Sequence, residues 1–198
     1  MKLSASILLT AIFLMLSSCI ATNAPLLADD KSNLHPLDEG YWQLCSRTTA
    51  NAVLNLGWGC SVLKLTHLPG NASAVVNAKG DATKATFTKL KAPGQFILEI
   101  PGDKVFNHML VKLEDADFVI GFSVACRSRD YTEKMDEKFK ELRISFNKDC
   151  LLMGESRESL TRFFEALSDQ TIFGLAVDDD LVMRKLPDER GRAAMIKK

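Results

Sequence analysis

The sequence has few of the residues, and none of the short motifs, that mark a catalytic or metal centre. Its three histidines, His35, His67 and His108, lie 32 and 41 residues apart, so no pair forms a metal-binding motif such as H-E-x-x-H. The G-x-S-x-G motif of serine hydrolases and the C-x-x-C motif of thiol oxidoreductases are both absent. The acidic run Asp178–Asp180 lacks the spacing and the glycine of a calcium-binding EF-hand. We therefore predict no catalytic residue, no metal site and no cofactor.

An excess of charge and long apolar runs are also missing. Lys and Arg together number 25, as do Asp and Glu, so the chain lacks the basic surplus typical of proteins that bind nucleic acid. The longest apolar stretch, Ile7–Leu16, has ten residues, whereas a membrane-spanning helix needs about 20. This stretch is too short to remain as a transmembrane anchor.

The N-terminus has the plan of a secretory signal peptide. Lys2 precedes the apolar stretch, and two small residues and a cysteine follow it. The ending Leu16-Ser17-Ser18-Cys19 resembles the bacterial lipobox, which implies that residues 1–18 are removed and that Cys19 is acylated, for example with palmitate. The alternative is an ordinary signal cut after Ala21 or Ala24, with Cys19 discarded.

The lipobox resemblance also implies a location. Ile20 stands where the inner-membrane retention signal of lipoproteins would be an aspartate, so we expect a cell-envelope protein anchored in the outer membrane and facing the periplasm. Each buried methylene of an acyl chain contributes about 0.8 kcal/mol, so two or three chains hold such a protein on the membrane. Residues 19–38 are polar and small without periodicity, and we interpret them as a lipidated, flexible tether.

Four further cysteines indicate disulfides, because exported proteins meet an oxidising compartment. They are Cys45, Cys60, Cys126 and Cys150. Three pairings are open, and we favour Cys45 with Cys60, and Cys126 with Cys150, because each closes a short loop. The alternative is that some are free, buried thiols.

The remaining chain divides into a β-rich domain, 39–187, and a basic tail, 188–198. Short apolar runs alternate with polar turns every 8 to 12 residues, as in an antiparallel sheet or barrel. Two helices are predicted in the C-terminal half, over Tyr131–Leu142 and Arg157–Leu167, and a last strand over Leu181–Leu186. For the second helix we predict Ser156 as the N-cap and one buried stripe, formed by Leu160, Phe163, Phe164 and Leu167.

The start of the β-rich domain, Gly40-x-Trp42, resembles the G-x-W motif of the lipocalins, whose tryptophan closes one end of a barrel. We therefore predict an α+β fold, mainly antiparallel β, as a meander sheet or a lipocalin-like barrel with two short helices. By the same resemblance, Trp42 lines a ligand pocket or plugs the barrel end. The interpretation of Trp42 and Trp58 as ordinary core residues stays open.

These observations favour a membrane-anchored envelope lipoprotein with a non-enzymatic β domain. Its partner would be another envelope protein or a small hydrophobic ligand. The alternative is a hydrolase acting on lipid or cell-wall material, with a site assembled from residues distant in sequence. A deep cleft that joins His67 or His108 to a carboxylate would favour the enzyme.

Overall fold

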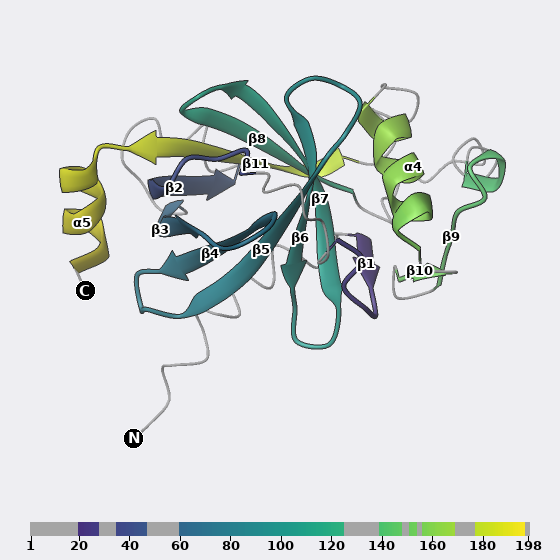
Figure 1. Ribbon diagram of the computed structural model, residues 1–198, viewed down its shortest axis with the longest axis horizontal. Coiled ribbons are helices and arrows are strands. Elements are labelled where there is room, and N and C mark those ends of the chain that lie inside the picture. The colour runs from purple at the N-terminus through teal and green to yellow at the C-terminus, as the bar shows by residue number, and fades with distance from the viewer. Residues whose placement is uncertain are drawn as a thin grey trace.

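The computed structural model describes residues 20–27, 35–46, 60–124, 139–147, 151–153, 156–168 and 177–196. Within this part of the chain, eight antiparallel strands form a closed barrel (Figure 1). Each strand pairs with the next, and the last pairs with both its predecessor and the first. The eight strands are β2 (Gly40–Ser46), β3 (Cys60–His67), β4 (Ala72–Asn77), β5 (Ala82–Lys89), β6 (Gln95–Pro101), β7 (Phe106–Asp115), β8 (Phe118–Val124) and β11 (Val177–Leu186). The α+β, mainly antiparallel fold is confirmed, and of its two predicted forms the barrel is the one observed.

The interior of the barrel is packed with apolar side chains from alternating positions of the strands. This interior core contains Leu37, Trp42, Leu65, Ala85, Phe87, Phe96, Leu98, Met109, Val111 and Val119. Trp42, Ala85, Phe87 and Val119 are only 0–2% exposed. A side chain that lined a water-sized void would keep accessible surface, so the barrel is filled around these four residues.

A second group of apolar residues covers the outer face of β6 and β7. Here lie the helix α4 (Arg157–Ser168), the short strand β1 (Ile20–Thr22) and the two-stranded sheet of β9 (Ser145–Phe146) and β10 (Leu152–Met153) (Figure 1). The buried members of this outer core are Ile20, Leu27, Leu90, Ile97, Leu110, Phe139, Ile144, Leu152, Leu160, Phe163, Phe164 and Leu167. Because successive side chains of a strand point to opposite faces, the strands contribute to two cores, one on each side of the sheet.

The structure confirms the predicted second helix, its cap and its stripe. Ser159 N donates to Ser156 Oγ at 3.0 Å, which satisfies one free amide of the first turn. All four stripe residues are at most 1% exposed, and the ring of Phe163 contacts those of Phe139, Phe146 and Phe164. The α4 stripe is thus part of the outer core.

We expect Phe163→Ala to lower the free energy of unfolding by about 3–5 kcal/mol, the usual cost of removing a large aromatic side chain from a core. The measurement is chemical unfolding of the folded domain. Glu158→Ala is the matched control, because Glu158 lies on the same helix with its side chain 80% exposed in its pair with Arg162, and it should cost less than about 1 kcal/mol. Equal effects of the two substitutions would contradict the core assignment.

The last predicted strand has different bounds, and the first predicted helix is described only in part. Residues 131–138 of the first predicted helix lie outside the described residues, although 139–141 are helical and Phe139 is buried. The last strand begins at Val177, four residues earlier than predicted, so the acidic run Asp178–Asp180 belongs to β11 instead of a preceding turn.

Within the predicted basic tail 188–198, residues Asp188–Ile196 form the helix α5. This helix packs against β2 and β3. Its only buried residue is Gly191, where an added Cβ would overlap Cβ and Cγ of Tyr41. Because the helix approaches the barrel through a glycine and has no apolar stripe, hydrophobic periodicity does not reveal it.

Candidate functional site

The residues directly after Cys19 are built into the fold. Strand β1 pairs antiparallel with the first part of β7, with Ile20 opposite His108, and β8 pairs with the same edge of β7 only from Leu110 onward. Ala21 also forms a parallel bridge to Leu151. Ile20 is 1% exposed and Thr22 is fully buried. The predicted flexible tether is therefore wrong over residues 20–27, which we call the N-terminal strap.

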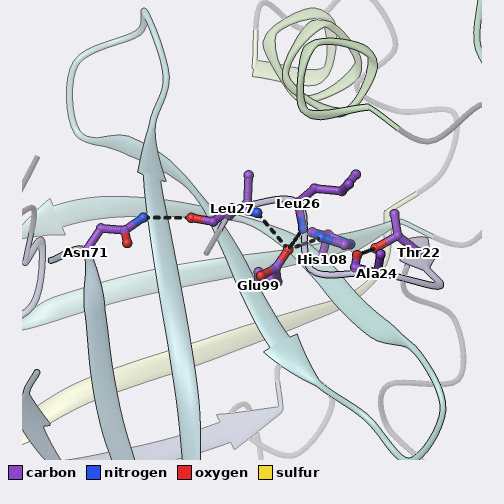
Figure 2. Close-up of polar contacts among 7 residues, drawn as sticks. All are labelled: Thr22, Ala24, Leu26, Leu27, Asn71, Glu99 and His108. Atoms are coloured by element: carbon purple, nitrogen blue, oxygen red, sulfur yellow. Dashed lines mark hydrogen bonds and ion pairs between the residues drawn. The ribbon is translucent and has the colours of Figure 1, made fainter. Parts of the chain in front are cut away.

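The strap crosses the outer face of the sheet and is fixed by one carboxylate (Figure 2). After Thr22, whose Oγ1 donates to the carbonyl of Ala24 at 2.7 Å, the chain turns. The backbone amides of Leu26 and Leu27 then donate to Glu99 Oε2 at 2.8 and 3.1 Å. Glu99 is on β6 and faces outward, beneath the strap.

Glu99 also pairs with a buried histidine. Its Oε2 lies 3.0 Å from His108 Nε2, and the two side chains are 3% and 0% exposed. The residues stand directly opposite each other on β6 and β7. His108 Nδ1 has no hydrogen-bond partner in the described part of the chain. Three donors thus converge on one carboxylate oxygen.

The end of the strap is held by an asparagine. Asn71 Nδ2 donates to the carbonyl of Leu27 at 3.1 Å (Figure 2). It also donates to the carbonyl of Phe87 at 2.7 Å. Asn71 is 1% exposed and is the last residue of the turn between β3 and β4. The strap is therefore bonded at both ends, by β-pairing to β7 and by side chains from β6 and the β3–β4 turn.

The histidine–carboxylate pair does not form an open catalytic cleft. The strap covers Glu99 and His108, and the hydrogen bonds of Glu99 go to backbone amides of the strap and to His108. A general base must reach the proton that it removes from a substrate. In this conformation the pair holds the strap in place and offers no access to a substrate.

The other two histidines lie together at one end of the barrel. The rings of His35 and His67 are stacked with centroids 4.0 Å apart, and His67 Nε2 is hydrogen-bonded to the carbonyl of Leu37. Burial lowers the pKa of His35, and the neighbouring His67 lowers it further, while Glu39 acts in the opposite direction. No group of three His, Cys, Asp or Glu residues within the described ranges is placed to hold a metal ion.

Trp42 lies near the same end, in the interior core. Its Nε1 donates to the carbonyl of Asp38 at 3.0 Å, and Leu37 packs in the same core. The carboxylate of Asp38 pairs with Lys185 at 2.8 Å, and this hydrogen bond holds the pKa of Asp38 below its usual value. Residues 35–38, also predicted as tether, are thus bonded to the barrel. Gly40 has φ 130°, which favours glycine at the first position of Gly40-x-Trp42.

The predicted disulfide between Cys45 and Cys60 is confirmed, and the two residues stand opposite each other on β2 and β3. The other predicted partners, Cys126 and Cys150, lie outside the described residues, as do Cys19 and Trp58.

We expect loss of the Cys45–Cys60 bond, which joins residues 15 apart, to lower the free energy of unfolding by about 3 kcal/mol in the chain-entropy model. The measurement compares urea unfolding of the wild type with that of the double variant Cys45→Ala and Cys60→Ala. A reductant should destabilise the wild type by at least this amount, because it would also break the predicted Cys126–Cys150 bond. If the double variant is as stable as the oxidised wild type, the bond contributes nothing.

The sequence predictions missed Glu99, His108 and Asn71 as residues that fix the N-terminal strap. One signal was available, since Glu99 interrupts the apolar run Phe96–Ile100 and a charge in such a run must find partners when it is buried. Nothing in the sequence says that these partners are the amides of residues 26 and 27.

Comparison with protein-family models, with curated proteins and with solved structures gave no match.

Proposed function

We propose that this protein is a bacterial envelope lipoprotein, cut before Cys19 and acylated there, whose barrel serves as a non-enzymatic binding or structural domain. The observation that carries the proposal is that Ile20, the residue directly after the lipobox cysteine, already belongs to a buried strand of the fold. Ile20 is buried in the outer core and paired with His108. A cut before Cys19 leaves the whole strap on the mature domain.

The two alternative cleavage sites fit the fold poorly. A cut after Ala21 would remove two of the three residues of β1, and a cut after Ala24 would remove all of it. Either cut would uncover part of the outer core and the edge of β7. The Cys45–Cys60 disulfide also supports export, since such bonds persist in oxidising compartments. No helix within the described residues is long and apolar enough to span a bilayer.

The barrel supports a lipocalin-like interpretation in its strand number and order, and Gly40-x-Trp42 stands at the start of its first strand. Barrels that carry a ligand inside need an interior cavity. Here the interior around Trp42, Ala85, Phe87 and Val119 is filled. We therefore favour a partner bound on the outer surface, namely another envelope protein, over a small hydrophobic ligand inside.

Mass spectrometry of the mature protein tests the proposal. The full chain is expressed in a bacterium and purified from membranes in detergent. We expect an N-terminal peptide that begins at Cys19 and carries the added mass of acyl chains. An unmodified chain that begins at Thr22 or Pro25 would contradict the proposal and establish one of the alternative cuts.

Native mass spectrometry separates the two kinds of partner. The domain is exported behind an ordinary signal so that it begins at Ile20, without an acyl anchor, and is purified without detergent. We expect the mass of the bare chain. A retained lipid-sized mass would instead place the binding function inside the barrel.

A further inference from the structure

No flexible residue separates Cys19, the proposed site of the acyl chains, from the strap, because Ile20 is the first residue of β1. Neighbouring Cα atoms are about 3.8 Å apart, so Cys19 lies within that distance of Ile20, which is 1% exposed. The acyl chains would be attached at Cys19 itself. Each of the two polar layers of a bilayer is roughly 5–8 Å thick, which is half the difference between the thickness of the whole bilayer and that of its hydrocarbon core. The barrel surface around Ile20 must then lie at the level of the lipid headgroups.

The surface beside β1 includes an exposed apolar side chain. Ala21 forms a bridge to Leu151, and strand β10 follows directly with Leu152 buried and Met153 51% exposed. Met153 and Ile196 are the large apolar side chains that stand out as exposed within the described residues. Ser145, opposite Met153 on β9, is exposed and uncharged. No charged side chain stands at these outward positions of the two-stranded sheet.

We propose that the surface beside the buried strand β1, formed by Ser145 of β9 and Met153 of β10 and here called the β1–β10 face, lies against the phospholipid bilayer with Met153 among the headgroups. The inference rests on the proposed acylation of Cys19. It fixes the orientation of the barrel, because α5 lies at the opposite end of the longest axis of the molecule from β9 and β10 (Figure 1). The barrel is held on the membrane by its β1–β10 face, and α5 points away.

Quenching of tryptophan fluorescence by brominated lipid tests this orientation. The acylated full-length protein, in a Trp58→Phe background, is reconstituted into phosphatidylcholine vesicles with bromine near the top of the acyl chains. Trp42 remains, but it is fully buried. Met153→Trp is compared with Ile196→Trp, a matched control that is 79% exposed on α5. We expect the brominated lipid to quench the fluorescence of Met153→Trp and to leave the fluorescence of Ile196→Trp unchanged.

A linker variant separates this proximity from acylation itself. About twelve glycine and serine residues, inserted between Cys19 and Ile20, give a flexible chain with an r.m.s. length of about 17–21 Å. The acyl mass should remain, while the quenching of Met153→Trp is lost. If Met153→Trp does not fold, Ser145→Trp reports on the same face.

The outcomes distinguish the two proposals. If the acyl mass is present but neither Met153→Trp nor Ser145→Trp is quenched, or if Ile196→Trp is quenched equally, the orientation is wrong and the lipoprotein stands. If the acyl mass is absent from Cys19, the proposed function fails, and the orientation fails with it.

Discussion

Replacing Cys19 with serine will abolish acylation and move the protein out of the membrane fraction. The sulfur of the cysteine is the acceptor in this chemistry, and the serine hydroxyl does not replace it because it is a far weaker nucleophile than a thiolate. In the proposed lipoprotein the acyl chains are the anchor, since anchoring of this kind depends on the burial of many methylenes. The measurement is incorporation of radiolabelled palmitate, followed by separation of membrane and soluble fractions.

Cys126→Ser is the matched control for this experiment. It also replaces one cysteine with serine but leaves the lipobox intact, so palmitate incorporation should equal that of the wild type. Wild-type labelling of Cys19→Ser would show that another residue accepts the lipid, and the anchor would then have to be placed elsewhere in the chain.

Glu99→Leu is expected to have the largest effect on stability, roughly 3–9 kcal/mol. The substitution leaves three donors without an acceptor, namely the amides of Leu26 and Leu27 and the ring of His108. Each unsatisfied buried group costs about 1–3 kcal/mol, and the amide of Leu26, which is only partly buried, falls at the low end of that range. Domains have a total stability of about 5–15 kcal/mol, so the variant should be close to unfolding at room temperature. Thermal unfolding followed by circular dichroism measures the loss.

Two further variants make the Glu99 result specific. Glu114→Leu is the same substitution on the neighbouring strand β7, where the side chain is 37% exposed and paired with Lys112, and it should cost less than about 1 kcal/mol. Glu99→Gln keeps an oxygen that accepts from the strap amides, and should fall between Glu99→Leu and the wild type. A melting temperature of Glu99→Leu within about 2 °C of wild type would mean that the carboxylate does not hold the strap.

Local patterns in the sequence were sufficient to predict a set of short antiparallel strands, the α4 helix and the Cys45–Cys60 pair. These features depend on residues that are close in the chain, such as the stripe of Phe163 and its neighbours, or two cysteines separated by one strand-to-strand connection. The sequence alone does not decide between an open meander sheet and a closed barrel. Closure requires pairing of β11 with β2, whose partners Met183 and Leu44 are far apart in the sequence.

The sequence does not predict the structure of the strap or of α5, for related reasons. Three residues of β1 are too few to show a period, and small polar residues such as Thr22 and Asn23 are typical of linkers. The strap is held by a side chain 72 and 73 residues away from the amides that it binds. For α5, the contact is a glycine against Tyr41. In both cases the stabilising partner is distant, and no local pattern records it.

The long-range pairing of the strap also sets an order of events during folding. In an exported chain the strap emerges first, but its acceptor Glu99 and its ladder partner His108 follow more than 70 residues later. Contacts of such separation form late, because the loop-closure entropy must be lost before any bond is gained. Until β6 and β7 have paired, the outer core lacks Ile20 and Leu27 and exposes the apolar surface that they cover. On the proposed export, the N-terminus of the new chain is therefore accessible to processing enzymes until the strap docks.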